Sequence, residues 1–162
     1  MAEIIKLHGD VEAAIEKHGD SLMSLCSVML RNREDAKDAV QECFLKYIQK
    51  APEFTSEEYE KAWLIRVAAN ICKDMLRLSK RRSLFSLEEV SDIAADENDA
   101  QILSLLMMLD EKYRAVMHLH YVEEYKINEI SRLLGITEAA VKKRLQRGRE
   151  ALRELYEKEL ER

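Results

Sequence analysis

The stretch that decides the fold is residues 126–153, KINEISRLLGITEAAVKKRLQRGREALR. Its first apolar residues recur at helical spacing, and Gly135 follows Leu134 where a helix commonly ends in a left-handed residue. Thr137 then stands at the position from which a side chain caps a new helix. The pattern predicts two helices that meet at a short glycine turn, a helix-turn-helix.

The second helix of this motif has one face to bury and another face made of hydrogen-bond donors. Val141, Leu145 and Leu152 fall on one stripe, with Gly148 between them. The remaining faces carry Lys142, Lys143, Gln146, Arg147 and Arg149. Such a helix suits the major groove of DNA, where cationic and amide side chains reach bases and phosphates. A two-helix hairpin with a solvated basic face is the alternative interpretation.

Composition favours an all-α protein of one ordinary domain or two small ones. The 162 residues include one Pro and four Gly, and aromatic residues make up 6%. No apolar run is long enough to span a membrane, and the N-terminal segment is too charged for a signal peptide, so we expect a cytoplasmic protein. Cys26, Cys43 and Cys72 lack metal-binding spacing and fall in apolar helical patterns, which indicates reduced core residues.

The net charge of −5 is unusual for a protein that binds nucleic acid, but the charges are segregated along the chain. Bases dominate residues 66–82 and 126–153, whereas residues 88–99 hold six acids and no base. This distribution predicts weak DNA binding by the protein alone and two basic surfaces that act when a partner holds the protein on DNA.

Residues 33–50 form a predicted helix with two different sides. Asn32 is placed to cap it, with Asp35 in the first turn. The predicted core stripe is Ala36, Ala39, Val40, Cys43, Phe44, Tyr47 and Ile48. The opposite side gathers Asp35, Asp38, Gln41, Glu42 and Leu45. An exposed leucine among acids suggests a docking face, and a solvated acidic face with one stray leucine is an equally good interpretation.

A second amphipathic helix is predicted after Pro52, which ends the helix before it. Thr55 or Ser56 is placed to cap this helix, which continues through WLIRVAANICKDMLRLSKRR, residues 63–82. Its predicted buried stripe is Leu64, Val67, Ala68, Ile71, Met75 and Leu78. Its polar face is Arg66, Asn70, Lys73, Asp74, Arg77 and Arg81. Mixed amide and cationic groups fit DNA contact, with surface solvation or an RNA patch as alternatives.

The remaining segments indicate where the other helices and the boundary between the two domains lie. Residues 3–31 predict one short helix or a ragged start and then a firm helix, with an interruption near Gly19. Residues 83–100 predict a linker, because their acidic second half cannot support a core. Helix returns with Ile102, and Asp110 is a plausible cap for the next helix. His118 and His120 lie on different helix faces, which argues against a shared metal.

Three separated segments together resemble one family, the extracytoplasmic-function (ECF) sigma factors of bacterial RNA polymerase. They are EDAKDAVQECFLKYIQ (34–49), WLIRVAANICKDMLR (63–77) and the stretch from Leu109 to Leu155 that contains the helix-turn-helix. The resemblance implies a sigma region 2 domain in residues 1–82, a linker in 83–100 and a sigma region 4 domain in 101–162. It also implies core RNA polymerase and promoter DNA as partners, regulation by an anti-sigma factor, and neither a cofactor nor a metal.

The resemblance also implies roles for particular residues. Those that match the helix docking on the clamp coiled coil of the largest polymerase subunit are Asp35, Asp38, Gln41, Glu42 and Leu45. Those that match contacts to the downstream (−10) element are Arg66, Asn70, Lys73, Asp74 and Arg77. Those that match the helix reading the −35 element are Thr137, Lys142, Lys143, Arg144, Gln146 and Arg147. The loop that captures a flipped base in the family corresponds to a region of roughly 54–60, without individual assignments.

The sequence departs from the family pattern at a few positions. The family commonly has Pro at Asp110, a small residue at Ser131 and often Ser at Lys143, and the last difference bears on base preference. Two other classes compete with a sigma factor. A regulator that binds DNA directly would need a dimer or an effector domain, and an enzyme would need a catalytic motif, which the sequence lacks.

Overall fold

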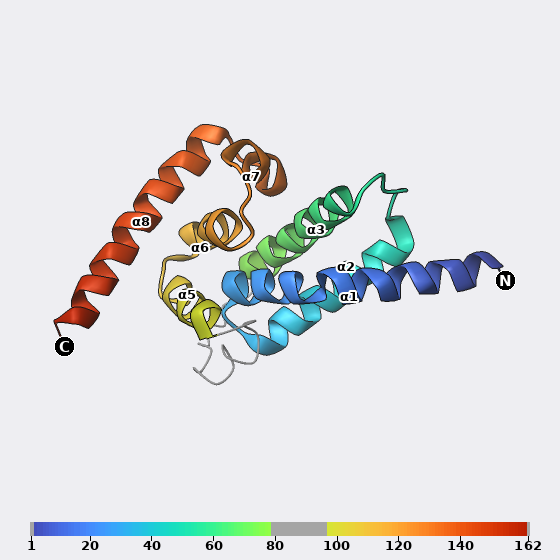
Figure 1. The fold of residues 1–162 in the computed structure, drawn as a ribbon, viewed down its shortest axis with the longest axis horizontal. Helices are drawn as coiled ribbons and strands as arrows, with labels where there is room; N and C mark the ends of the chain where they lie inside the picture. Colours follow the sequence, from blue (N-terminus) through green and yellow to red (C-terminus); the bar gives the residue numbers. More distant parts are fainter. Residues whose placement is uncertain (1, 79–96, 162) are drawn as a thin grey trace. The chain divides into compact units, whose positions relative to one another are not determined.

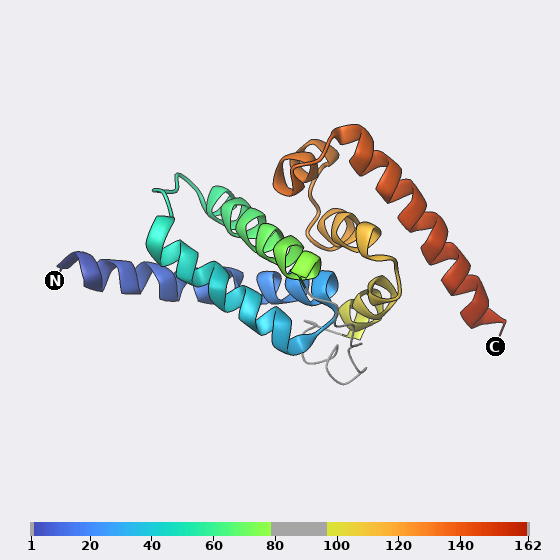
Figure 2. The same ribbon diagram turned by 180° about the vertical axis from the view of Figure 1, so that it is seen from behind.

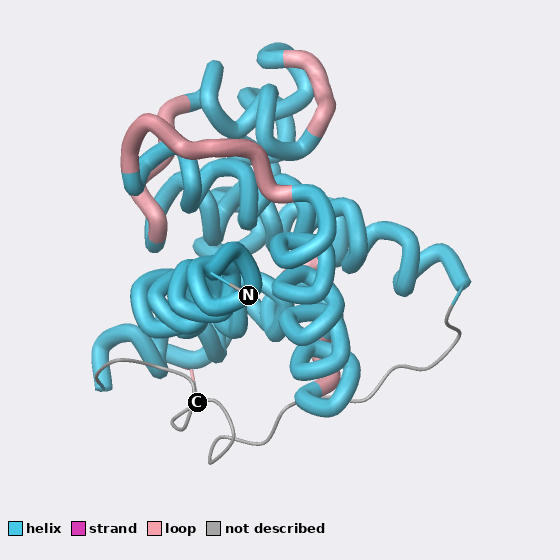
Figure 3. Tube along the Cα trace, turned by 90° about the vertical axis from the view of Figure 1, so that its right-hand side faces the viewer, coloured by secondary structure: helices cyan, strands magenta, loops and turns pink. Residues whose placement is uncertain are grey.

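The protein is described by a computed structural model that covers residues 2–78 and 97–161, and within these ranges every regular element is a helix (Figure 1). The all-α prediction is confirmed. The chain divides into two compact units, Met1–Arg81 and Arg82–Arg162. Within the described residues, helices make up most of each unit and are joined by short loops, as the trace in Figure 3 shows.

Unit 1 consists of three helices that pack against one another, α1 (Ala2–Leu30), α2 (Arg33–Lys50) and α3 (Glu57–Leu78) (Figures 1 and 2). The predicted interruption near Gly19 is wrong, because α1 is continuous. A glycine inside a helix costs only about 1 kcal/mol relative to alanine. Leu22 and Leu25, which are buried on the next turns, contribute more than this to the stability of the helix.

Both predicted caps of unit 1 are present. The backbone N–H of Asp35 donates to Asn32 Oδ1 at 3.0 Å, so Asn32 caps α2. The backbone N–H of Tyr59 donates to Ser56 Oγ at 3.1 Å, so Ser56, of the two candidates, caps α3. Pro52 lies in the loop between the two helices, directly after the C-cap residue Ala51.

The buried faces of α2 and α3 differ from the predicted stripes at their ends. Ile48 is 43% exposed and Leu78 is 84% exposed, so both predictions of burial are wrong. Both residues continue the apolar period of their helix, but at these positions no neighbouring helix in the described part of the chain covers the apolar side. In the middle of α3 the buried face is wider than predicted, because α3 packs against both α1 and α2. Its buried residues are Leu64, Ile65, Ala68, Ala69, Ile71 and Cys72.

The prediction that the three cysteines are core residues is confirmed. Cys26, Cys43 and Cys72 come from α1, α2 and α3, are fully buried, and form no disulfide. A hydrogen bond with Cys72, together with burial, raises the pKa of Cys26 well above its usual value. Burial, followed by the nearby Cys26, raises the pKa of Cys43 to about 12. The thiols of Cys26 and Cys43 therefore stay protonated, and all three buried cysteines act as small apolar groups.

Unit 2 begins, within the described residues, with α5 (Glu97–Met107), which starts before the expected Ile102. Most of the predicted linker, residues 83–96, lies outside the described residues. The unit continues with α6 (Glu111–Met117), a π-helical turn η1 (His118–Val122), α7 (Ile127–Leu134) and α8 (Glu138–Leu160). Asp110 holds the N-cap position of α6, but its side chain makes no capping hydrogen bond, so the prediction of a capping side chain is wrong.

The helix-turn-helix is formed by α7 and α8 as predicted. Gly135 ends α7 in the left-handed region with φ of 67°. Thr137 caps α8, because its hydroxyl oxygen accepts a hydrogen bond from the backbone N–H of Ala140 at 3.0 Å. A residue with a Cβ atom would be strained at Gly135, so this glycine sets the angle between the helices.

The core of unit 2 lies under the first half of α8. Val141 and Leu145 are buried at 0% and 1% exposure, and Leu152 is half-buried. Gly148 lies against Met117 of α6, so closely that an added Cβ would come within 2.8 Å of the Met117 Cγ and Sδ atoms. The glycine allows α8 to approach α6 at this point.

Candidate nucleic-acid interface

The exposed side of α8 carries most of the predicted upstream-element residues. Lys142, Lys143, Gln146 and Arg147 are exposed, on the side of the helix away from Val141 and Leu145, and Arg144 is half-buried. The Gln146 amide donates to Glu150 at 3.4 Å, a long contact within the same helix. The Thr137 hydroxyl oxygen is used in the cap.

A contact that the sequence did not predict ties α8 to the π-helical turn. Arg149 Nη1 donates to the hydroxyl oxygen of Tyr121 at 3.1 Å, and the Tyr121 side chain is itself 47% exposed. The two residues are 28 positions apart, so no local pattern links them. Arg149 therefore uses one of its hydrogen-bond donors within unit 2 and has fewer donors left for contact with DNA.

On α3, the predicted downstream-element residues Arg66, Asn70, Lys73, Asp74 and Arg77 are all exposed. Asp74 and Arg77 form an ion pair one turn apart. This ion pair neutralises part of the positive charge of the face. The face is therefore moderately basic, and it also carries an amide and a carboxylate group.

The predicted docking face on α2 is largely exposed. Asp38, Gln41 and Glu42 lie on the surface with Leu45, whose side chain is 52% exposed, while Asp35 is half-buried in the first turn. Ile48 lies one turn beyond Leu45 and adds a second exposed apolar side chain that the sequence analysis had placed in the core. Two neighbouring apolar residues within an acidic face favour docking over simple solvation.

Four aromatic rings gather where the loop between α2 and α3 meets both helices. The Phe54 ring stacks on Tyr47 at a centroid distance of 6.0 Å, and it meets Tyr59 and Trp63 edge-on at 5.2 and 5.9 Å. Tyr47 and Trp63 also meet edge-on at 6.1 Å. Two of these rings, Phe54 and Tyr59, lie in the region of roughly 54–60 for which the family resemblance predicts capture of a flipped base.

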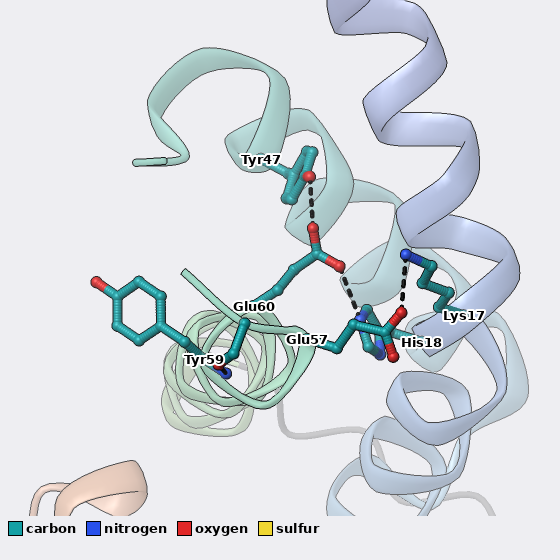
Figure 4. A network of polar contacts seen from close by, with 7 residues as sticks. Lys17, His18, Tyr47, Glu57, Tyr59 and Glu60 are labelled. Carbon is teal, nitrogen blue, oxygen red and sulfur yellow. Dashed lines mark hydrogen bonds and ion pairs between the residues drawn. The ribbon is translucent and has the colours of Figure 1, made fainter. Parts of the chain in front are cut away.

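Beside these rings, the Glu60 carboxylate joins all three helices of unit 1 (Figure 4). Its Oε1 lies 2.9 Å from His18 Nε2 on α1, and its Oε2 accepts a hydrogen bond from the Tyr47 hydroxyl on α2 at 2.9 Å. Burial, followed by the hydrogen bond to Glu60, raises the pKa of Tyr47, so its hydroxyl keeps the proton that it donates. Lys17 and Glu57 form a more exposed ion pair at 3.0 Å.

This network was missed at the level of sequence. The predicted core stripe of residues 33–50 includes Tyr47 but gives its hydroxyl no partner. Glu60 is 13 residues from Tyr47 and 42 residues from His18, so its partners become neighbours only when the three helices pack. The one available signal was a carboxylate in the first turn of a helix, which by itself is ordinary.

An open hollow of about 610 Å³ lies next to the network. Its walls come from α1, the end of α2, the loop and Glu60 on α3. Among the described residues, no group of three or more His, Cys, Asp or Glu side chains is arranged to hold a metal ion. None of the helices in those ranges combines the length and the apolarity needed to cross a bilayer.

Comparison with known proteins identifies the class of both units. Residues 14–82 match the family model for sigma-70 region 2, and residues 99–152 match the model for sigma-70 region 4. The protein is therefore an RNA polymerase sigma factor, a transcription initiation factor.

The relatives narrow this class to one group. The chain is 31% identical to the ECF RNA polymerase sigma factor SigW of Bacillus subtilis, over 90% of this chain and 89% of that protein. It is also 31% identical to the ECF RNA polymerase sigma factor SigM of Mycobacterium tuberculosis, over 95% of this chain and 83% of that protein. The chain belongs to the ECF sigma factors.

Solved structures agree on the fold. The sigma factor RpoE of Bartonella quintana, in a complex with the anti-sigma factor NepR, matches with a TM-score of 0.69 at 20% identity, over 91% of this chain and 97% of that chain. CnrH, in a complex with the cytosolic domain of CnrY, matches with a TM-score of 0.66 at 24% identity, over 91% and 87%.

Proposed function

We propose that this protein docks on bacterial core RNA polymerase through the exposed face of α2. The residues that make the contact are Asp35, Asp38, Gln41, Glu42 and Leu45, with Ile48 as a further apolar contact. Leu45 is half exposed on the side opposite the buried Cys43 and Phe44, so it is available without any rearrangement of unit 1. In protein interfaces, an apolar side chain surrounded by polar ones typically supplies the central contact. The partner surface is the clamp coiled coil of the largest subunit.

The face of α3 contacts the downstream promoter element in this proposal. Arg66, Lys73 and Arg77 neutralise phosphates, and Asn70 and Asp74 are the groups able to accept or donate hydrogen bonds at bases. The aromatic cluster around Phe54 lies at the start of the same helix, and aromatic rings stack on unpaired bases. Strand opening therefore belongs to unit 1.

The exposed side of α8 reads the upstream element. Lys142, Lys143, Gln146 and Arg147 project from the first three turns of the helix, which is the part that a helix-turn-helix inserts into the major groove. Thr137 fixes the start of the helix, and Arg144 contributes from a half-buried position. Residues 83–96 connect the two DNA-binding units.

The protein acts in the cytoplasm, where bacterial polymerase and chromosome meet, and it is not an enzyme itself. Its regulation is assigned to an anti-sigma factor that covers one or more of these faces in the resting cell. The structural relative RpoE of Bartonella quintana, which is bound to an anti-sigma factor, supports this part of the proposal.

The observation that carries the proposal is the pair of exposed polar helix faces, one in each sigma unit, each on the far side of a buried apolar stripe. The test is transcription by core polymerase with and without the protein, on promoters selected from a randomised library. Specific initiation should appear only when the protein is added. Tight, sequence-specific binding of duplex DNA by the protein alone at physiological salt would favour a direct regulator instead.

A further inference from the structure

The Glu60 carboxylate, at the start of α3, forms hydrogen bonds with side chains of both other helices of unit 1, His18 on α1 and Tyr47 on α2 (Figure 4). Its side chain is 15% exposed, and the His18 side chain is 6% exposed. Hydrogen bonds to a charged group that is shielded from water are stronger than those at the surface. The network therefore restrains the first turn of α3 relative to α1 and α2.

Tyr47 links this restraint to the loop of residues 51–56. Its hydroxyl donates to Glu60, while its ring stacks on Phe54, the apolar residue of the loop. The backbone N–H of Ala51 also donates to the carbonyl oxygen of Tyr47 at 3.1 Å, where α2 ends. Tyr47 thus connects the carboxylate and the Phe54 ring through its side chain, and the end of α2 through its backbone carbonyl.

The network lies beside the loop rather than within the core. The centre of unit 1 is closed by apolar residues such as Leu22, Leu64 and Ala68, which are fully buried without it. Glu60 instead borders the open hollow that Phe54 also lines. Loss of its hydrogen bonds should therefore loosen the loop before it unfolds the unit.

We propose that Glu60, together with His18 and Tyr47, is a positioning residue that holds the 51–56 loop and the Phe54 ring in place for contact with unpaired promoter DNA. The inference rests on the proposed function, because it assigns the loop to the opened downstream element. Single-stranded DNA is bound by preplaced aromatic surfaces, and a loop that must first be ordered binds more weakly.

Two conservative variants test this in transcription. Tyr47→Phe removes one hydroxyl and keeps the ring on Phe54, and Glu60→Gln removes the charge while keeping the side-chain length. The control is Glu16→Gln, which removes the same charge from an exposed position on α1. Each protein is assayed with core polymerase on a selected promoter, both as a duplex and with the downstream element already opened by mismatched strands.

We expect Glu60→Gln to lower transcription from the duplex about tenfold and Tyr47→Phe about fivefold, as the loss of one buried hydrogen bond predicts. On the opened template both variants should come within about twofold of the parent protein, since the loop contact no longer has to offset the cost of unpairing the strands. Glu16→Gln should match the parent on both templates. An unchanged rate on the duplex, or an equal loss on both templates, would overturn the proposal.

Trp63 supplies a second measurement that needs no promoter. It is the only tryptophan in the chain and touches both Tyr47 and Phe54. In the free protein, acrylamide quenching of Trp63 fluorescence should rise about twofold in the two variants if the loop loosens, with unchanged helical circular dichroism. If the parent protein starts no transcription at all, the proposed function fails, and quenching alone decides whether Glu60 holds the loop. Unchanged quenching would reject that role.

Discussion

The helices α3 and α8 both present polar faces to solvent, but they are held in different ways. Helix α3 packs against two long helices and buries six residues between Leu64 and Cys72. Helix α8 rests mainly on the short helices α6 and α7, through Val141, Leu145 and the close approach at Gly148. A hydroxyl caps the start of each helix, Ser56 for α3 and Thr137 for α8, and the Glu60 network restrains the start of α3 in addition.

This difference indicates that two helices with similar exposed faces can differ in how much stability they lose when a buried residue under them is replaced. The apolar core of α3 is distributed over three helices, so a single replacement there removes a small part of it. The core under α8 depends on a few residues from short helices, which have little stability of their own. We therefore expect substitutions under α8 to be costly and substitutions on either polar face to affect binding alone.

The largest effect should come from Val141→Asp, which places a carboxylate in a fully buried position under α8. We expect a loss of about 4 kcal/mol in the free energy of unfolding of unit 2. Thermal unfolding followed by circular dichroism, with NMR spectra to distinguish the units, measures this. Ala139→Asp makes the same change at an exposed position of α8 and should leave the unit folded. Unfolding of unit 1 by Val141→Asp would contradict the separation drawn above.

A smaller effect, confined to binding, is expected on the face of α2. Replacing Asp38 and Leu45 together with alanine should weaken the affinity for core polymerase by about 3 kcal/mol, roughly a hundredfold in Kd. Both side chains are exposed, so the helical content should not change. Lys37→Ala, on the flank of the same helix, is the control, and titration with labelled core polymerase gives the affinities. If the double variant unfolds, these residues contribute to the core and the docking assignment is wrong.

The third prediction concerns base choice by α8. Arg147→Ala should relax the preference at one upstream base pair by about 2 kcal/mol, the usual worth of a bidentate contact between arginine and guanine. Arg153→Ala, further along the helix, should act weakly and equally on all sequences. A promoter library scored with both variants separates the two cases. An unchanged base preference for the Arg147 variant would mean that this side chain contacts only the backbone.

The smallest effect is expected at Gly148. Alanine gains about 1 kcal/mol in helix propensity, but its Cβ would lie 2.8 Å from the buried Met117 side chain. Overpacking of this kind costs about 1 to 3 kcal/mol, so we expect Gly148→Ala to destabilise unit 2 by about 1 kcal/mol. With Met117→Ala also present, the same change should stabilise. A urea-unfolding cycle measures the coupling, and stabilisation by Gly148→Ala alone would show that Met117 moves aside.

Features set by short stretches of chain could be predicted from the sequence. The caps at Asn32 and Thr137 and the left-handed turn at Gly135 each depend on residues only a few positions apart. The same periodic patterns placed the candidate DNA and polymerase contacts on exposed faces, with Asp35 and Arg144 half-buried. What these faces bind stays a prediction, because exposure alone does not identify a partner.

Features that depend on where a neighbouring helix ends could not be predicted. Ile48 and Leu78 continue a helical period beyond the core, so periodicity alone assigned them wrongly. The contacts of Glu60 with Tyr47 and His18 arise from the packing of three helices, and no local rule relates those positions. The π-helical turn at His118–Val122 likewise has no signal in the apolar spacing.

The placement of the cysteines gives the protein a built-in reporter. All three thiols of the chain lie in the centre of unit 1, and unit 2 has none. A thiol-specific reagent can react only when unit 1 opens, since all three thiols are shielded from solvent. The labelling rate therefore measures how often unit 1 opens, and unit 2, which holds the helix-turn-helix, contributes no thiol to the signal.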